Sequence, residues 1–415
     1  MKFGGASVKD AAAIRNAAEI IAQHQEHALL VVISAMDKTT NHLENLAYLA
    51  RDGKETEAKE QFEKIKRFHL GIVKDLFADK ETEVTAKVED FLGRIDRIVS
   101  GILMLEEFPP RTYDRIVSFG ELLSTTIVAG YLNHIEKEAV WIDARDYLKT
   151  DANYRQAGVI WSLTEANIRT QVMSLARQGR ALITQGFIGS TTDGKTTTLG
   201  REGSDYTASI FAHCLNASSL IVWKDVPGIL NGDPRIMKET IKIDNLSYEE
   251  AVEMTFYGAS VIHPKTIKPI FNKRIPLRVK CFLDVSLPGT VISEQTNPEV
   301  ITSYIVKKNQ VFIRIKPRDF SFLEENLMQE IFAHVNKSGL KVNLLQNSAI
   351  SLMLCVDNRP AVINAFEALL LDQFLVEIQE GLKLNTVINF GKKDLGDLDD
   401  AKMVQMQENK LYVVK

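Results

Sequence analysis

The sequence begins with a segment suited to binding an anion. Lys2 lies in a short strand-like stretch, Met1 to Phe3. Gly4 and Gly5 follow this stretch, and a helical pattern starts after them. Free backbone N–H groups in such a turn, and the positive end of the helix dipole, attract negative charge. The lysine precedes the glycines, so the segment is neither a P-loop nor a Gly-x-Gly-x-x-Gly turn. A plain tight turn stays open as the alternative to phosphate binding.

A second segment, Gly-Arg-Glu-Gly-Ser-Asp-Tyr-Thr, places Arg201 between two glycines and puts Ser204 and Asp205 at a helix start. Arginine can hold a carboxylate or a phosphate through two parallel hydrogen bonds. An aspartate beside a lysine in a phosphate site can orient that lysine. A helix N-cap is the simpler reading of either Ser204 or Asp205, but it leaves the arginine unexplained.

Further polar segments follow apolar runs. The longest, residues 223–235, is dense in Gly, Pro and Asp, and residues 34–41 and Gly120-Glu121 are weaker examples. Ligands of open parallel sheets bind beyond the carboxyl ends of the strands. Each segment taken alone is equally well explained as a surface loop.

Composition narrows the class of protein. The chain has 415 residues, 45% of them apolar, and a net charge of -4. This length favours two or three domains, and the charge balance gives no field for holding nucleic acid or an anionic membrane surface. No apolar run approaches the 18 or so residues of a membrane span. Three widely spaced cysteines, at 214, 281 and 355, predict free buried thiols in a reducing cytosol.

The pattern of elements predicts an α/β protein. Strands expected near 28–33, 139–142, 181–187, 219–223 and 277–282 alternate with helices, which is typical of a mostly parallel sheet covered by helices on both faces. Charged and apolar residues alternate at helical spacing from about 43 to 110, and we interpret that stretch as a helical insertion. We expect core positions for three aromatic residues, Trp161, Phe211 and Phe256, and a structural role for His263.

Beyond a Pro/Gly-rich boundary near residues 288–298 the rhythm changes. Strands expected at 301–306, 310–316, 340–346, 349–356 and 374–379, with helices at 320–337 and 359–371, give one β-α-β-β-α-β unit of the ferredoxin-like kind. Further strands are expected near 385–390 and 411–414. The predicted domains are therefore 1–292 and 300–415.

Five segments together resemble the motif set of the aspartokinases, in the same order. They are Lys-Phe-Gly-Gly-Ala-Ser-Val, Ser118-Phe-Gly-Glu, Gly-Arg-Glu-Gly-Ser-Asp-Tyr-Thr-Ala, Lys-Asp-Val-Pro-Gly-Ile with Asp-Pro-Arg, and Tyr257-Gly-Ala-Ser-Val-Ile-His-Pro. The resemblance spans nearly all of residues 1–290, and the tail is similar to the ACT regulatory domains of that family. It implies an amino-acid-kinase catalytic domain followed by an ACT region whose second unit is incomplete.

The resemblance also implies roles for individual residues. Lys2 and Asp205 match the catalytic lysine and its acidic partner. The positions matching the aspartate site are Ser34, Thr40, Glu121, Arg201, Gly203 and Ser204. The positions matching the ATP site are Lys2, Phe3, Gly4, Gly5, Lys224, Asp225, Leu230, Arg235 and Ser260. No protein ligand for a metal is implied.

The implied reaction is the ATP-dependent phosphorylation of the L-aspartate side chain, the first step towards lysine, threonine and methionine. A carboxylate is already ionised at pH 7 and needs no general base, so catalysis consists of positioning and charge neutralisation by lysine, backbone N–H groups and Mg²⁺. ATP and Mg²⁺ are the expected cofactors, the cytoplasm is the expected location, and a homodimer is the expected assembly. A glutamate or acetylglutamate kinase, or an inactive amino-acid sensor, are the alternatives.

Some positions depart from the family pattern. Only Met1 precedes Lys2, so the chain start is expected to leave the first strand short and Lys2 near a frayed terminus. Ser260 stands where many relatives have a lysine or glutamine near the nucleotide, and Leu230 replaces an aromatic residue seen in some of them. We hypothesise that Lys224 supplies the missing positive charge. Asn343 and Ala349 stand where lysine-sensing relatives have acidic residues, which predicts weak or altered feedback inhibition by lysine or threonine.

Overall fold

A computed structural model of the chain describes residues 1–24, 28–78, 82–259, 262–295, 301–391 and 400–415. The chain forms two compact units. The first comprises Met1–Ile229, Asp244–Tyr248 and His263–Thr296, and the second comprises Leu230–Ile243, Glu249–Ile262 and Asn297–Lys415. Two segments that precede the expected boundary near residue 292 therefore group with the C-terminal unit. The limits of the functional domains, 1–292 and 300–415, stay a prediction.

The first unit is built on an eight-stranded sheet with the order β10-β12-β11-β7-β1-β2-β4-β3. Every neighbouring pair in it is parallel except β11 with β12. The strands are β1 (Lys2–Phe3), β2 (Leu30–Ile33), β3 (Ala139–Trp141), β4 (Ala181–Gln185), β7 (Leu220–Lys224), β10 (Asn245–Ser247), β11 (Leu277–Cys281) and β12 (Thr290–Ser293). Three residues of β2 are fully buried, as expected of a central strand covered on both faces. The predicted mostly parallel sheet is confirmed.

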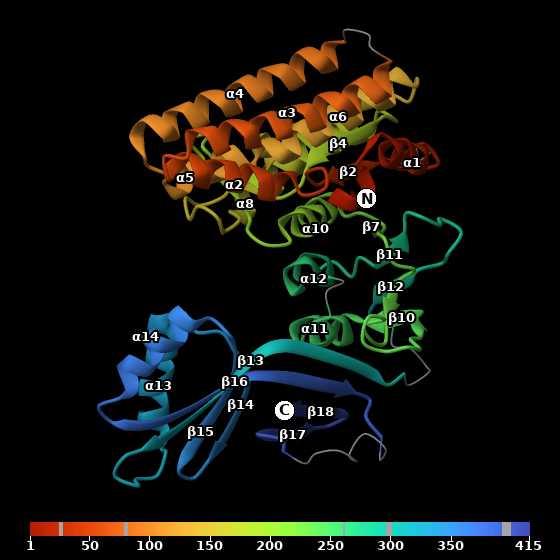
Figure 1. Cartoon of the computed structure of the whole chain (residues 1–415). Coiled ribbons are helices and arrows are strands. Elements are labelled where there is room, and N and C mark those ends of the chain that lie inside the picture. The colour runs from red at the N-terminus through yellow and green to blue at the C-terminus, as the bar shows by residue number, and fades with distance from the viewer. Residues whose placement is uncertain (25–27, 79–81, 260–261, 296–300, 392–399) are drawn as a thin grey trace. The chain divides into compact units, whose positions relative to one another are not determined.

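Helices cover this sheet (Figure 1). They are α1 (Ala11–Ala22), α2 (Thr39–Arg51), α3 (Glu55–Phe77), α4 (Glu83–Leu105), α5 (Pro110–Val117), α6 (Phe119–His134), α7 (Ala144–Tyr147), α8 (Trp161–Asn167), α9 (Met173–Ala176), α10 (Gly203–Leu215) and α12 (Pro264–Phe271). A 3₁₀ turn, η1 (Gly5–Val8), follows β1, and a π-helical turn, η2 (Ile168–Val172), joins α8 to α9.

The helices expected between about residues 43 and 110 are α2, α3 and α4, of which α3 and α4 lie side by side in Figure 1. That this stretch is an insertion stays a prediction. Helix α6 packs directly against α4. A Cβ atom placed on Gly130 of α6 would lie only 2.2 Å from Val84 Cγ2 of α4, so the lack of a side chain there permits the close approach. Most of the apolar side chains that face inward from these helices join one core with strands β1 and β2.

Some features of the first unit were not predicted. The hairpin of β5 (Ile188–Ser190) and β6 (Thr196–Thr198) was missed, as were the helices between residues 161 and 176. Phe211 is buried as expected. The core positions expected for Trp161 and Phe256 are wrong, because these side chains are 36% and 42% exposed. Trp161 is the first residue of α8, where its ring packs edge-on against His213 instead of entering the core.

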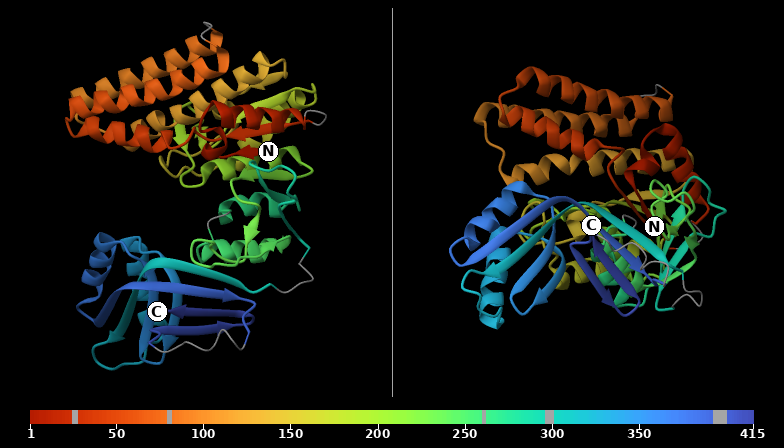
Figure 2. Two further views of the ribbon diagram at one scale, coloured as in Figure 1. Left: turned by 45° about the vertical axis from the view of Figure 1, so that its right-hand side comes forward. Right: turned by 60° about the horizontal axis from the view of Figure 1, so that its bottom comes forward.

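The second unit contains a six-stranded antiparallel sheet with the order β14-β15-β13-β16-β18-β17. Its elements are β13 (Ser303–Pro317), α13 (Glu325–Ser338), β14 (Val342–Ser348), β15 (Ser351–Asp357), α14 (Pro360–Leu370), β16 (Phe374–Ile388), β17 (Met403–Gln407) and β18 (Lys410–Val414). Both helices lie on the same face of the sheet (Figure 2). The predicted ferredoxin-like order is confirmed.

Two pairs of predicted strands are single long strands. Residues 301–306 and 310–316 were expected to be separate, but β13 runs through both, and β16 likewise joins 374–379 to 385–390. The register between β13 and β16 shifts near Lys307 and Gln310, and Asn309 has a φ of 58°. Such a bulge bends a strand without ending it, which is why turn-forming residues in the sequence suggested a break. Strand β17 lies in a segment for which no strand was expected.

The other face of this sheet is covered by helix α11 (Tyr248–Phe256) and the residue after it. Tyr257 packs against Tyr412 of β18 with ring centroids 4.8 Å apart, and Glu253 of α11 pairs with Lys410 at 3.3 Å. A small hairpin of β8 (Ile229–Leu230) and β9 (Lys242–Ile243) is held nearby, because Asn231 accepts a hydrogen bond from Tyr304 N–H at 2.7 Å. These contacts explain why both segments belong to the C-terminal unit.

Two sequence-level expectations concern the whole chain. All three cysteines are free and buried, as predicted. In the part of the chain that the structure describes, no helix combines the length and the apolar character that crossing a bilayer requires.

Candidate active site

The candidate site lies at the carboxyl end of β1, the strand near the middle of the large sheet. Lys2 is opposite Val32 on β2 and Val222 on β7, and both neighbours run parallel to β1. Ser34, the first residue after β2, donates its backbone N–H to Phe3 O at 3.1 Å. The ends of three strands thus meet at one edge of the sheet, where ligands of open parallel sheets bind.

Two lysines share one buried carboxylate at this edge. Lys2 Nζ lies 2.6 Å from Asp205 Oδ1, and Lys224 Nζ lies 3.2 Å from Asp205 Oδ2. The Asp205 side chain is 1% exposed, and those of Lys2 and Lys224 are 6% and 20% exposed. Burial alone would raise the pKa of Asp205, but the two ammonium groups reverse this effect and hold it below its usual value. Lys2 is therefore buried and fixed, so the expectation of a frayed position is wrong.

The geometry of the strands and of α10 explains this cluster. Lys2 is opposite Val222, and residues two apart in a strand share a face, so Lys224 points to the same side of the sheet as Lys2. Asp205 is in the first turn of α10, where the helix dipole favours a negative charge. The N-cap of α10 is Glu202, which is in the left-handed region with a φ of 56°. Neither Ser204 nor Asp205 caps the helix, so that simpler explanation is wrong.

The glycine turn lies against the lysine. A Cβ atom on Gly4 would lie 3.5 Å from Lys2 Nζ. A Cβ atom on Gly5 would lie 2.7 Å from Ala35 O and 2.8 Å from Asp37 O, so no larger residue fits there without displacing the backbone after β2. The segment that the sequence singled out for anion binding therefore places a buried ammonium group beside a partly buried glycine turn.

A second carboxylate, Glu121, is buried close to Lys2. Ala35 N–H donates to Glu121 Oε1 at 3.2 Å, whereas Oε2 is buried and has no partner among the described residues. Burial raises the pKa of Glu121 to about 8, an increase that Lys2 partly opposes. Gly120 packs against Ala35 and lies near Thr40 Oγ1. Thr40 therefore lies beside the residue that precedes Glu121 in α6.

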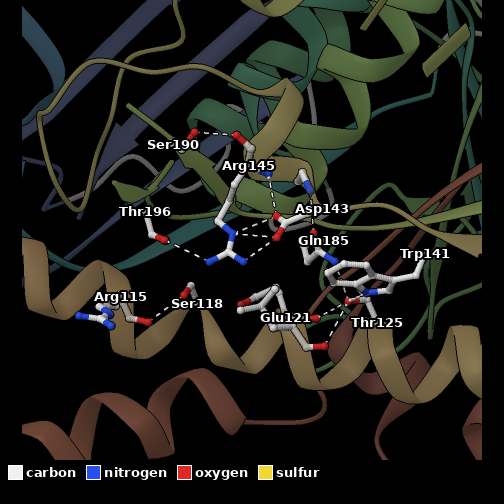
Figure 3. Close-up of polar contacts among 12 residues, drawn as sticks. Arg115, Ser118, Glu121, Thr125, Trp141, Asp143, Arg145, Gln185, Ser190 and Thr196 are labelled. Atoms are coloured by element: carbon white, nitrogen blue, oxygen red, sulfur yellow. Dashed lines mark hydrogen bonds and ion pairs between the residues drawn. The ribbon is translucent and has the colours of Figure 1, made fainter. Parts of the chain in front are cut away.

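Polar contacts below Glu121 fix its helix to the sheet (Figure 3). Thr125 Oγ1 donates to Glu121 O at 2.8 Å and accepts hydrogen bonds from Gln185 Nε2 and Trp141 Nε1, both at 2.9 Å. Gln185 is the last residue of β4, and its Oε1 accepts the Ala144 N–H at 2.8 Å. Helix α6 is therefore tied to the end of β4 and to the start of α7.

A neighbouring ion pair in Figure 3 holds the β5–β6 hairpin. Arg145 pairs with Asp143 at 2.6 Å and donates to Thr196 Oγ1 at 3.2 Å. Ser190 Oγ donates to Arg145 O at 2.6 Å, so both strands of the hairpin are attached to α7. The hairpin leads directly into the segment that carries Arg201.

The turn after β4 is a part of the site that sequence reasoning missed. Phe187 has a φ of 66°, and its N–H donates to Thr207 Oγ1 of α10 at 3.0 Å. A Cβ atom on Gly186 would lie 2.4 Å from Ser204 Cβ, so the turn presses directly on the start of α10. The available signal was the expected strand at 181–187, whose carboxyl end had to lie at the same edge of the sheet.

The remaining predicted residues are placed as follows. Arg201 is exposed in the loop before α10, Gly203 is buried in its first turn, and Asp225 is exposed after β7. Leu230 and Arg235 belong to the second unit, where Arg235 pairs with Asp233 at 2.8 Å, and Ser260 lies outside the described residues. His263 has the predicted structural role, because its Nδ1 accepts the Lys265 N–H and caps α12.

Comparison with known proteins agrees with this site. The model of the amino acid kinase family matches residues 1–281. Lysine-sensitive aspartokinase 3 of Escherichia coli (strain K12) is 31% identical over 93% of this chain and 86% of its own length. Aspartokinase 1, chloroplastic, of Arabidopsis thaliana is 32% identical over 94% of this chain and 68% of its own length.

Solved structures show the same relationship. The crystal structure of E. coli aspartokinase III in complex with aspartate and ADP (R-state) superposes with a TM-score of 0.89 at 28% identity, covering 100% of this chain and 95% of that one. The T-state structure of the same enzyme, in complex with lysine and aspartate, gives 0.82.

A mostly parallel sheet with a lysine and glycine turn at its carboxyl edge, together with the family match over two thirds of the chain, defines the class. The chain belongs to the amino acid kinase family. Within that family its similarity extends over nearly the whole chain to the aspartokinases, including their C-terminal regulatory region.

The raised pKa of Glu121 gives a testable effect on stability. The folded protein keeps a proton on Glu121 up to pH about 8, whereas an ordinary glutamate loses it near 4.5. Stability should therefore fall as the pH rises through this interval. Glu121→Gln should remove this loss and make the protein more stable than the wild type at pH 8, by on the order of 3 kcal/mol in urea denaturation.

The control is Glu83→Gln, which alters an exposed glutamate on α4 that pairs with Lys87. The stability of this variant should depend on pH in the same way as that of the wild type. If Glu121→Gln and the wild type lost stability in parallel between pH 5 and 8, the burial argument for Glu121 would be wrong.

Proposed function

We propose that this protein transfers the γ-phosphoryl group of ATP to the side-chain carboxylate of L-aspartate. The product is 4-phospho-L-aspartate, and the reaction opens the biosynthetic route to lysine, threonine and methionine. Its substrates are ATP and L-aspartate. The observation that carries the proposal is the buried Lys2–Asp205–Lys224 cluster beside a second buried carboxylate, Glu121, in a chain similar throughout to a structure solved with aspartate and ADP.

The reaction requires two anions to approach each other. The aspartate side chain is ionised near neutral pH, so its oxygen attacks the γ-phosphorus directly and ADP leaves with the electron pair of the broken P–O bond. The main task of the protein is to neutralise charge and to align the reactants. Lys2 is the group we assign to the transferred phosphoryl, and Asp205 keeps its ammonium group in place.

Lys224 adds a second positive charge to the same carboxylate. We assign four further residues of the first unit to binding of the nucleotide: Phe3, Gly4, Gly5 and Asp225. Three residues outside the first unit are also assigned to it: Leu230, Arg235 and Ser260. The position of the Lys224 ammonium group beside Asp205 supports the hypothesis that Lys224 supplies the positive charge that the serine at position 260 lacks.

The substrate amino acid has three charged groups to be recognised. We assign its α-ammonium group to Glu121, whose Oε2 is buried without a partner among the described residues, and its α-carboxylate to Arg201. We assign four further residues to the surroundings of the substrate's α-ammonium and α-carboxylate groups: Ser34, Thr40, Gly203 and Ser204. The proximity of Ser34 to Phe3 and of Thr40 to Gly120 supports this assignment.

Mg²⁺ is part of the proposal as the partner of the nucleotide. The described residues contain no cluster of three or more His, Cys, Asp or Glu side chains that could hold a metal ion, and Asp205 is committed to two lysines. The phosphate oxygens and water would therefore provide most of its ligands, as is usual for Mg²⁺ bound with ATP. When bound, the ion neutralises phosphate charge.

An assay that traps the acyl phosphate with hydroxylamine tests the function. The wild-type protein with MgATP should form hydroxamate from aspartate and none from glutamate. Lys2→Ala should lower kcat by about two orders of magnitude or more, because the transferred phosphoryl loses its nearest positive charge. Lys224→Ala should raise KM for ATP and leave KM for aspartate nearly unchanged.

Lys9→Ala is the matched control, since Lys9 is an exposed lysine that directly follows the 3₁₀ turn η1. It should behave as the wild type. Hydroxamate formed from glutamate would instead support a glutamate kinase, and no product from either amino acid would support a sensor without catalytic activity.

Feedback control is a further part of the proposal. Asn343 of β14 donates to Gln310 Oε1 at 2.7 Å and to Asp357 Oδ1 at 2.8 Å, and it accepts from Lys307 Nζ at 2.7 Å. Asp357 is itself paired with Lys307 at 2.8 Å. The ammonium group of Lys307 thus already pairs with Asp357, the carboxylate of this cluster, and the Ala349 side chain carries no charge.

Weak or altered feedback inhibition is therefore expected. Lysine or threonine added at sub-millimolar concentration should leave most of the hydroxamate-forming activity intact. Strong inhibition by lysine in that range would contradict this part of the proposal, and an inhibited Asn343→Asp variant beside an uninhibited wild type would support it.

We also propose that the protein is a homodimer that forms through its C-terminal region, in the cytoplasm. Among the residues that the structure describes, β14 and β17 are the two edge strands of the antiparallel sheet, and each pairs there with a single neighbour. An exposed edge is suited to pairing with a copy of itself. The three free, buried thiols agree with a reducing compartment. Light scattering at micromolar concentration should give twice the mass of one chain, and a monomer mass would rule the dimer out.

A further inference from the structure

A third buried carboxylate, Asp114 of α5, has no part in the chemistry described above. Its side chain is fully buried and accepts four hydrogen bonds. Arg155 N–H lies 2.9 and 3.1 Å from its two oxygens, Thr198 N–H donates at 2.8 Å, and Thr198 Oγ1 donates at 2.9 Å. A buried charge is tolerated only when it is this well satisfied.

One end of this network is the helix that carries Glu121. Ser118, between α5 and α6, has right-handed helical dihedral angles, and hydrogen bonds continue through it from Asp114 to Leu122. Asp114 and Glu121 are therefore seven residues apart on one nearly continuous helical path, a rise of about 10 Å. A shift of Asp114 along this path is passed on to Glu121.

The other end is the segment that carries Arg201. Thr198 is the last residue of β6, and both its backbone N–H and its hydroxyl group are bound to Asp114. Leu199 then donates its N–H to Phe187 O, and Gly200 turns with a φ of 77°. Only two residues, Leu199 and Gly200, separate the anchored Thr198 from Arg201, so the anchor limits where the guanidinium can lie.

Arg155 presses on the same turn from the other side. Its φ of 71° is unusual for a residue with a side chain, and its N–H is one of the donors to Asp114. The guanidinium lies 4.0 Å from the ring centre of Tyr113 and donates to Tyr48 Oη at 3.2 Å. Arg155 O lies 3.1 Å from the position of a Cβ atom on Gly200. The carboxylate thus holds together three segments around this glycine.

We propose that Asp114 is a positioning residue that sets the separation of Glu121 and Arg201, the two groups assigned to the α-ammonium and α-carboxylate of the amino-acid substrate. The inference rests on the proposed function. It predicts an effect on recognition of the amino acid and not of the nucleotide, because the network does not include Lys2, Lys224 or the glycine turn.

Asp114→Asn tests it in the hydroxylamine assay. The amide keeps the shape of the side chain but offers one acceptor oxygen in place of two and turns an N–H group towards the N–H donors. KM for aspartate should rise about tenfold or more, while KM for ATP should change by less than about twofold. A role in stability alone would lower the melting temperature or kcat without separating the two KM values.

Thr198→Val is the milder variant, because it removes one hydroxyl donor and keeps the backbone bond. It should raise KM for aspartate severalfold, and it carries the test if Asp114→Asn does not fold. Thr164→Val is the matched control, since Thr164 is also fully buried and bonded to a backbone carbonyl, that of Lys149, but lies outside the network. It should leave both KM values unchanged.

The outcomes separate the two claims. A wild-type protein without aspartate-dependent product contradicts the proposed function itself. An active wild type whose Asp114→Asn or Thr198→Val variant keeps its KM for aspartate, or raises both KM values equally, contradicts the positioning role alone.

Discussion

The structure of the site depends on one buried carboxylate that holds two ammonium groups. Asp205 is 1% exposed and lies 2.6 Å from Lys2 and 3.2 Å from Lys224. Without Asp205 the two lysines would repel each other in a region of little solvent, and neither would have a fixed position. The parallel register of β1 with β7 puts both lysines on one face, and α10 supplies the carboxylate from its first turn. The cluster is therefore a product of the sheet topology and not of a local motif.

The first unit holds two further buried carboxylates, Glu121 and Asp114, and each differs from Asp205 in its electrostatic surroundings. Asp205 is held ionised by its two lysine partners, whereas burial raises the pKa of Glu121 to about 8. One oxygen of Glu121 is buried and has no hydrogen-bond partner among the described residues. Asp114 is satisfied entirely by hydrogen-bond donors of the protein. A buried carboxylate such as Glu121, which lowers the stability of the folded protein while no ligand is bound, is typical of a binding site. Asp114, with no free oxygen, is instead part of the scaffold.

The sequence predicted those parts that are local in the chain. The lysine and glycine turn, the start of α10 and the end of β7 are contiguous segments whose residue types indicate their roles. Asp114 gave no such signal, because its donors are 41 and 84 residues away. Gly186 and Phe187 were missed because the expected strand ran on to residue 187, whereas β4 ends at Gln185 and these two residues form the turn after it. In the second unit, the bulge near Asn309 made one long strand look like two, since turn-forming residues alone do not distinguish a bend from an end.

The most direct test of phosphate binding by Lys2 is a crystal structure of the protein with a non-hydrolysable ATP analogue and L-aspartate. We expect Lys2 Nζ to lie about 3 Å from an oxygen of the γ-phosphate while Asp205 still contacts both lysines. A structure in which Lys2 stays paired with Asp205 but the phosphate groups bind away from the carboxyl end of β1 would contradict it.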